Sequence, residues 1–141
     1  MKRVVITGLG LLTSIGNNTK ETWNNLINCE SGIKKISHFD TNGLTCQIAG
    51  YISQYDSSHK FYYDINKHLE LKDIKRNDRF IQYGIAAAKM AIEDSGINNL
   101  SEEKKLKIGV SVGSGIGGLE TIYEGSLTID QKGPRKLSPF F

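Results

Sequence analysis

The apolar residues of this chain follow two spacings along its length, one typical of strands and the other of helices. Residues 3–7 include consecutive branched apolar side chains, which predicts a strand buried on both faces. Residues 107–112 place a branched apolar residue at every second position, and residues 46–52 also alternate. Both of these stretches are therefore predicted to be strands as well.

The first predicted helix follows Asn18. Asn18 is a good N-cap residue, and Glu21 stands three positions later, where a capping box places its acidic partner. The helix has one apolar face and is expected to stop near Gly32. The residues of that face are Trp23, Leu26 and Ile27.

Three further helices are expected over residues 65–76, 78–95 and 117–129, where apolar residues recur three and four positions apart. In the second of them, consecutive alanines at 86–88 leave room for a neighbour to pack closely. Residues 53–64 are polar and aromatic without periodicity and are expected to be irregular. Because strands alternate with helices, the chain is predicted to have an α/β fold with a mostly parallel sheet.

The composition of the chain excludes several functional classes. Its 141 residues form one domain or part of one, and a 38% hydrophobic share opposes disorder. A net charge of +3 is too small to indicate nucleic acid binding, and no apolar stretch has the length of a membrane span. We therefore expect no nucleic acid and no membrane as partners. Cys29 and Cys46 form no disulfide framework, which is compatible with a cytoplasmic location.

The glycines that follow the strand at 107–112 invite a nucleotide-binding interpretation. Gly113, Gly115 and Gly118 fit the pattern G-x-G-x-x-G. A dinucleotide site also needs an acidic residue at the end of the next strand, about 20 residues further on. Asp130 comes only 12 residues after Gly118, at a predicted helix end. The glycines are therefore interpreted as a tight turn or as the lining of a site, and the pattern does not decide between these two.

The chain offers no recognisable set of catalytic residues. His38, His59 and His68 lie in polar stretches without helical pairing, and no Cys–His, Ser–His–Asp or metal-ligand spacing is present. No metal and no cofactor is predicted. Two basic clusters suit either a solvated face or the attraction of an acidic protein partner. They are Lys72, Lys75, Arg76 and Arg79, and Lys132, Arg135 and Lys136.

Several stretches together resemble the N-terminal part of the β-ketoacyl-acyl carrier protein synthases. The most specific are residues 113–118, Gly-Ser-Gly-Ile-Gly-Gly, and residues 133–141, Gly-Pro-Arg-Lys-Leu-Ser-Pro-Phe-Phe. The remaining stretches are residues 4–10, 15–17, 31–33, 38–41, 80–84 and 94–96. The resemblance is closest to the type II enzymes that elongate fatty acids, and it spans essentially the whole chain.

This resemblance implies a thiolase-like α/β fold, of which residues 1–141 would be an incomplete N-terminal half with a parallel or mixed sheet and flanking helices. Such enzymes are homodimers that use acyl- and malonyl-loaded acyl carrier protein. A cysteine accepts the acyl chain, the malonyl group loses carbon dioxide, and its carbanion attacks the thioester. In the family the cysteine follows the region that ends at Phe141, and two histidines come later, so no catalytic residue is expected here.

The positions that the resemblance carries over are peripheral to the chemistry. Gly115, Ile116 and Leu119 fall where the family lines its acyl pocket, and Phe141 falls where one subunit closes the pocket of the other. The carrier-protein docking positions are Lys72, Lys75, Arg76, Arg135 and Lys136.

The sequence thus predicts the N-terminal portion of a condensing enzyme of fatty-acid biosynthesis, inactive by itself. Two terminal phenylalanines in a loop support an incomplete fold, because exposing them forfeits roughly 1.5–3 kcal/mol of burial each. Two alternatives stay open. One is a non-catalytic module that binds carrier protein or complements another chain, and the other is a nucleotide-binding α/β domain.

Overall fold

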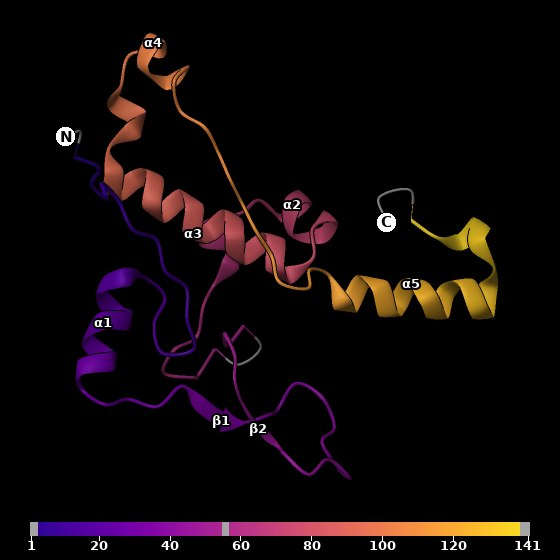
Figure 1. The fold of residues 1–141 in the computed structure, drawn as a ribbon. Coiled ribbons are helices and arrows are strands. Elements are labelled where there is room, and N and C mark those ends of the chain that lie inside the picture. The colour runs from indigo at the N-terminus through magenta and orange to yellow at the C-terminus, as the bar shows by residue number, and fades with distance from the viewer. Residues whose placement is uncertain (1–2, 55–56, 139–141) are drawn as a thin grey trace.

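The computed structural model describes residues 3–54 and 57–138 (Figure 1). The longest helix of the described residues is α3 (Arg79–Ser95), and the N-terminal half of the chain lies along one side of it. The remaining elements are α1 (Thr19–Ile27), β1 (Ile33–Lys35), β2 (Ile48–Gly50), α2 (Leu71–Arg76), α4 (Glu102–Lys105) and α5 (Leu119–Lys132), with 3₁₀ turns at Ile65–Lys67, Ile97–Asn99 and Pro134–Lys136.

The core is small and lies between α3 and the irregular segment before α2. Tyr63, Leu69 and Ala86 are its buried members, and Ala86 is completely inaccessible to solvent. The hydroxyl of Tyr63 lies 2.8 Å from Nδ1 of His68, so its polar end has a partner. Residues 53–54 and 57–64 are irregular, as expected, but they also supply the largest buried side chain of the described residues, that of Tyr63.

Helices α1 and α3 begin at the residues that the sequence indicates, and α3 also ends there, whereas α1 ends at Ile27 rather than near Gly32. Asn18 accepts a hydrogen bond from the Glu21 amide at 2.8 Å and caps α1, and the Glu21 carboxylate accepts from the Asn17 amide. Asp78 caps α3 at its N-terminus. Gly96, with φ of 68°, ends α3 in the left-handed conformation that glycine adopts without strain.

Close approach of the N-terminal segment to α3 explains two of the glycines. A Cβ atom on Gly10 would collide with the carbonyl oxygen of Ala87, and one on Gly8 would collide with that of Ala91. The alanine-rich face of α3 therefore does receive a close neighbour, and that neighbour is backbone rather than side chain. The amide of Leu9 also donates to the Asp94 carboxylate at 2.9 Å.

The predicted sheet differs from the observed one. The described residues contain one two-stranded antiparallel sheet, in which Lys34 pairs with Ala49, so the mostly parallel sheet is a wrong expectation for this part of the chain. Residues 3–7 and 109–112 are extended but unpaired among the described residues, whereas the amides of Lys107 and Ile108 donate to carbonyls of α4. Val4 is 95% exposed and Val110 is 88% exposed. A run of apolar residues favours an extended conformation. A β-strand, however, also needs a neighbouring strand with which to form backbone hydrogen bonds.

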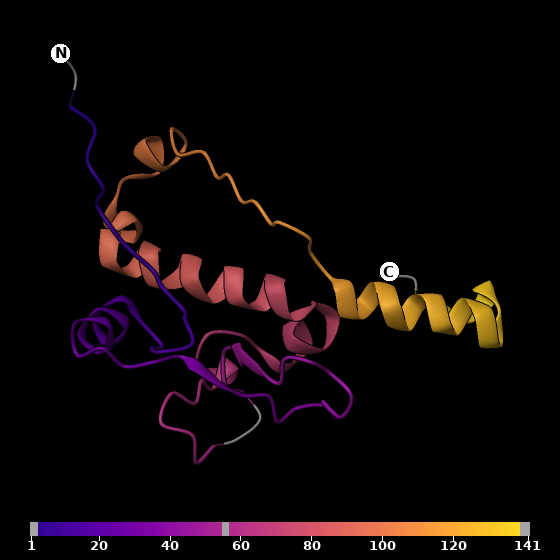
Figure 2. The same ribbon diagram turned by 60° about the horizontal axis from the view of Figure 1, so that its bottom comes forward.

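Other apolar faces are also open to solvent within the described residues. The predicted inner face of α1 is exposed, and Trp23 retains 61% of its accessible surface. Helix α5 projects away from the rest of the molecule in both views (Figures 1 and 2). The single helix predicted over 65–76 is in fact a 3₁₀ turn followed by α2.

The crossing of the N-terminal segment over α3 gives a first prediction. Replacing Gly10 with alanine forces backbone apart and is expected to lower the free energy of unfolding by about 2 kcal/mol. Urea denaturation followed by circular dichroism measures the change. Gly84→Ala is the matched control, because nothing lies within 4 Å of its added Cβ and alanine favours the helix by about 0.5–1 kcal/mol. Equal effects of the two substitutions would contradict the close crossing.

Candidate functional site

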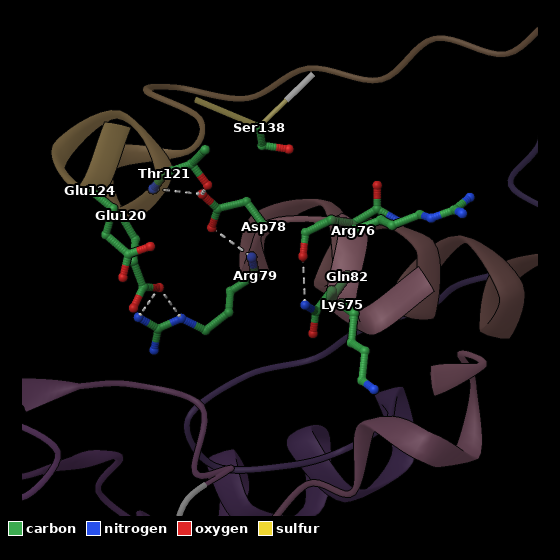
Figure 3. Close-up of a pocket in the computed structure, with 10 residues that line it drawn as sticks. Lys75, Arg76, Asp78, Arg79, Gln82, Glu120, Thr121, Glu124 and Ser138 are labelled. Carbon is green, nitrogen blue, oxygen red and sulfur yellow. Dashed lines mark hydrogen bonds and ion pairs between the residues drawn. The ribbon is translucent and has the colours of Figure 1, made fainter. Parts of the chain in front are cut away.

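The ends of α2, α3 and α5 meet around a polar pocket of about 460 Å³ (Figure 3). Basic and acidic side chains line it together, so it is not a purely cationic surface. The lining residues are Lys75, Arg76, Asn77, Asp78, Arg79, Gln82, Glu120, Thr121, Glu124 and Ser138.

Gln82 fixes the end of α2 to α3. This side chain is buried at 6% exposure, and its Nε2 donates to the carbonyl oxygens of Ile74 at 3.0 Å and Asn77 at 2.7 Å. These carbonyls belong to the end of the short helix, where backbone acceptors lack partners within the helix. The basic residues of α2 are thereby held at a fixed position relative to α3.

The Asp78 carboxylate lies at the start of two helices. Its Oδ1 accepts from the Arg79 amide at 2.6 Å, at the beginning of α3. Its Oδ2 accepts from the hydroxyl of Thr121 at 2.5 Å and from the amide of Thr121 at 3.3 Å, in the first turn of α5. A negative charge is favourable at a helix N-terminus, and here a single carboxylate serves both helices.

A second polar contact runs parallel to the first. The Arg79 guanidinium donates from Nε at 2.9 Å and from its terminal nitrogen at 2.6 Å to one oxygen of Glu120 (Figure 3). Arg79 therefore does not extend the basic face of α2, although the sequence groups it with Lys75 and Arg76. The ion pair adds a directional link between α3 and α5.

These contacts also set the titration of Asp78. Partial burial by itself raises the pKa of the Asp78 carboxyl, whereas hydrogen bonds from the Thr121 side chain and amide and from the Arg79 amide lower it. The hydrogen bonds prevail, and the pKa of Asp78 lies below its ordinary value.

The glycine turn before α5 is shaped by the same carboxylate. A Cβ atom on Gly118 would lie 2.6 Å from Oδ2 of Asp78, which is too close for a real side chain. Gly117 has φ of 85°, a left-handed conformation that favours glycine. Gly113 and Gly115 have open space around them. Of the two interpretations of the glycines, the tight turn therefore accounts for Gly117 and Gly118.

The position of Asp78 opposes nucleotide binding at this turn. In dinucleotide sites the phosphates lie on the backbone amides at a helix N-terminus after a glycine turn. At the start of α5, the Thr121 amide is already engaged by a carboxylate. A phosphate there would face a negative charge at close range.

The structure brings only part of the predicted docking set together. Lys75 and Arg76 line the polar pocket, and Lys72 lies on the same short helix, where it pairs with Glu70 at 2.7 Å. Arg135 and Lys136 lie in the 3₁₀ turn after α5, about 20 Å along the helix from its start. The two basic groups therefore lie at opposite ends of α5.

The predicted acyl-pocket residues lie in and just after the glycine turn. Ile116 is 75% exposed and Leu119 is 60% exposed, and nothing lies within 4 Å of an added Cβ on Gly115. Phe141 lies outside the described residues. Next to the turn, an apolar groove of about 470 Å³ is lined by Phe80, Ile81, Gly84, Ile85, Ala88, Val112, Gly113 and Ser114.

Sequence reasoning missed the residues that join α3 to α5. Asp78 was recognisable only as the start of a helix, and nothing at Glu120 or Thr121 signals a partner about 40 positions upstream. One local signal was present, because the residue before α5 is Gly118, which has no side chain to cap the helix itself.

The described residues supply no other obvious chemical centre. No group of three or more histidine, cysteine or acidic side chains among them is placed to hold a metal ion. Cys29 and Cys46 are both exposed and free. Among the same residues, no helix is long and apolar enough to cross a lipid bilayer.

Comparison with known proteins identifies the family. Residues 1–141 match the family described as beta-ketoacyl synthase, N-terminal domain. The chain belongs to the beta-ketoacyl synthase family. The resemblance drawn from the glycine turn and the C-terminal loop is thereby confirmed.

Curated relatives of this ketoacyl synthase chain carry a common name, 3-oxoacyl-[acyl-carrier-protein] synthase 2. The protein of Vibrio cholerae is 44% identical over 140 residues, and that of Vibrio harveyi is 41% identical over 140 residues. The protein of Staphylococcus aureus strain COL is also 41% identical. In each case the match covers 99% of this chain and 32% of the relative, so the chain spans about a third of their length.

A solved structure confirms the predicted thiolase-like fold class. The ishigamide ketosynthase/chain length factor superposes with a TM-score of 0.68 at 27% sequence identity. The likeness covers 96% of this chain and 32% of that one. The arrangement described above therefore corresponds to an incomplete N-terminal half of a ketosynthase fold.

The lowered pKa of Asp78 predicts that the junction is sensitive to acid. The ionised carboxylate contributes stability above its ordinary pKa of about 4, and this contribution is lost as the pH falls through the lowered value. We expect Asp78→Asn to melt at a lower temperature than the unmodified chain at about pH 6, and the difference to shrink toward about pH 3. Thermal melts across this range measure it, and a constant difference would contradict the assignment.

Proposed function

We propose that this chain is the N-terminal portion of a 3-oxoacyl-acyl carrier protein synthase II, which condenses acyl- and malonyl-loaded acyl carrier protein in fatty-acid biosynthesis. The observation that carries the proposal is the family match over residues 1–141, together with relatives of that name at 41–44% identity. The proposal includes a cytoplasmic homodimer as the assembled enzyme.

The reaction is a decarboxylating Claisen condensation. Loss of carbon dioxide from the malonyl thioester leaves a carbanion, which attacks the carbonyl carbon of the acyl thioester. A carbon–carbon bond forms, the carbon–sulfur bond breaks, and the thiolate leaves. Family resemblance places the nucleophilic cysteine and the two histidines after Phe141, so residues 1–141 contribute surroundings and not reacting groups. The domain is accordingly a partial ketoacyl synthase domain.

The α2 surface is proposed to receive the carrier protein. Lys75 and Arg76 border the pocket of Figure 3, and Lys72 has a side chain with 65% of its surface accessible. Hydrogen bonds from Gln82 hold the end of the same helix. Exposed cations on a fixed element attract an acidic partner and raise its association rate. Arg135 and Lys136 would form a second, separate contact at the far end of α5.

The glycine turn and the start of α5 are proposed to form one wall of the acyl pocket. Ile116 and Leu119 present apolar side chains that the described residues leave uncovered, and Gly115 adds no bulk beside them. The groove along Val112 and Phe80 continues this apolar surface. A hydrocarbon chain gains about 0.8 kcal/mol for each methylene group that it buries there. Phe141 would close the pocket of a partner subunit.

A chain-complementing role is the second candidate, and it rests on a specific observation. Residues 3–7 and 109–112 are extended, rich in valine and unpaired among the described residues. Val4 and Val110 are the most exposed of these, at 95% and 88%. Such segments present free backbone donors and acceptors that favour the addition of a further strand. The relatives contain about twice this length again, which suffices to supply it.

Reversal of charge on α2 tests the docking surface. The triple variant Lys72→Glu, Lys75→Glu and Arg76→Glu is expected to weaken binding of acyl carrier protein at least tenfold at low salt, because attraction becomes repulsion. Titration calorimetry at low and high salt measures the effect, which salt should reduce.

The matched control reverses the same number of charges on another short helix. Lys104→Glu, Lys105→Glu and Lys107→Glu alter the net charge equally but lie at α4 and just beyond it, away from the pocket. Carrier-protein affinity should change little in this control. Equal losses in both triple variants would indicate an effect of net charge alone and would contradict a docking surface on α2.

A synthase assay tests whether the reacting groups lie outside residues 1–141. The 141-residue polypeptide, incubated with acyl- and malonyl-loaded carrier protein, is expected to give no condensation above a control without enzyme. Addition of a polypeptide that spans the remaining two-thirds of the Vibrio cholerae relative is expected to restore product, since the apolar segments then gain strand partners. Product from the 141 residues alone would contradict the proposal.

A further inference from the structure

The attachment of α5 to the rest of the molecule is polar. Its apolar positions do not pack on α3 in the described part of the chain: Leu119, Ile122 and Tyr123 are 60%, 54% and 66% exposed. The contacts that do join the two helices are those of Asp78 with Thr121 and of Arg79 with Glu120. Both views of the ribbon show α5 extending outward from this junction (Figures 1 and 2).

We propose that Asp78 is a positioning residue that fixes the start of α5, and with it the Gly115–Leu119 wall, relative to the basic surface of α2. We call the contact of the Asp78 carboxylate with Thr121 the tether. What the two surfaces bind rests on the proposed function, whereas the tether itself does not. Asp78 touches no reacting group in this proposal, and it acts through Thr121.

The Asp78 carboxylate acts as the N-terminal cap of α5, which has no capping side chain of its own. A helix commonly begins with a residue whose side chain accepts a hydrogen bond from the amide two or three positions later. Gly118 stands at that position and has no side chain, while the amide three positions on belongs to Thr121 and donates to Asp78. The cap is thus supplied by another element, so capping and attachment become a single interaction.

The space beside Gly118 is matched to this arrangement. The Asp78 carboxylate lies against the position that a Cβ atom of residue 118 would take, with Oδ2 at 2.6 Å and Cγ at 3.2 Å from it. A side chain at position 118 would therefore displace the carboxylate from its position against the start of α5. The backbone conformation at Gly118, with φ of −86°, does not itself require glycine. The approach of Asp78 explains the glycine instead.

The tether reaches from one proposed surface to the other. Asp78 follows α2 by two residues, and Gln82, one turn further along α3, holds the end of α2 through Ile74 and Asn77. Gly118 directly precedes Leu119 of the proposed acyl wall. Asp78 and its neighbours therefore connect the proposed docking surface for the carrier protein to the proposed wall that the acyl chain would contact.

A pair of substitutions separates a tether from a simple cap. Asp78→Ser keeps a capping hydroxyl for α3 but is one bond too short to hold Thr121. Adding Gly118→Ser then gives α5 a cap of its own. In the double variant both helices are capped and the link from position 78 to Thr121 is absent, so the ion pair of Arg79 with Glu120 is the remaining described contact between them. Asp130→Asn is the control for the loss of a carboxylate, since Asp130 lies exposed on α5 away from the pocket.

Three measurements are made on the complete synthase of which this chain is proposed to be the N-terminal portion. Hydrogen exchange reports the protection of amides in the first turns of α5. Spin labels at Glu93 on α3 and Gln131 on α5 report the spread of distances between the helices, in a variant in which Cys29, Cys46 and every cysteine after Phe141 are replaced by serine. Steady-state assays report kcat/KM for a long-chain acyl carrier protein and for malonyl carrier protein.

We expect Asp78→Ser to lower protection in α5 and to broaden the distance distribution. The double variant should recover protection but keep the broad distribution. Its kcat/KM should fall about tenfold for the long acyl substrate and stay within about twofold for malonyl carrier protein, whose short group needs no apolar wall. Asp130→Asn should change none of these.

Recovery of a narrow distribution in the double variant, or an unchanged distribution in Asp78→Ser, would overturn the tether. A broadened distribution with unchanged kcat/KM for the long acyl substrate would overturn the positioning role. Absence of condensation in the unmodified complete synthase would refute the proposed function, and the distance measurement would still decide whether Asp78 fixes the start of α5.

Discussion

The carboxylate of Asp78, placed between the first turns of two helices, is the interaction on which the arrangement of this molecule depends. Without it α5 has no cap, and the described contact that still joins it to α3 is the ion pair of Arg79 with Glu120, because its apolar side chains do not pack on α3 in the described residues. A charged hydrogen bond is stronger and more directional than a neutral one, so a single group can determine the direction of a whole helix. The ion pair of Arg79 with Glu120 then limits rotation about that point.

The part of the molecule that precedes α5 is held together by close packing. Tyr63 and Ala86 are excluded from solvent, and backbone at Gly10 lies directly against α3, so displacement of any element there opens a gap or forces a collision. The proposed docking surface on α2 is attached to this packed half through Gln82. The proposed acyl wall is attached, in the described part of the chain, through the hydrogen bonds of Asp78 and the ion pair of Arg79. The docking surface on α2 should therefore be rigid. The position of the acyl wall should respond to pH and to substitution of Asp78.

The sequence predicted best what is decided locally. Asn18, Asp78 and Gly96 were recognisable as helix boundaries because capping involves residues only a few positions apart. The core residue Tyr63 was missed because it lies in a segment without periodicity, and the unpaired state of residues 3–7 was missed because an apolar run does not specify its neighbour. The family was recognisable from motif order, which carries information that hydrophobic spacing lacks.

The glycine turn shows most clearly why the rest could not be derived. G-x-G-x-x-G followed by a helix describes equally a cradle for phosphate and a gap for a protein carboxylate, since both need bare backbone at a helix N-terminus. The two differ in what occupies the gap, and the occupant here is Asp78, 40 positions before Gly118. No local pattern records that distance. A helix N-terminus already neutralised by the chain itself attracts anions weakly, which leaves the apolar residues beside it, Ile116 and Leu119, as the chemically distinctive part of the turn.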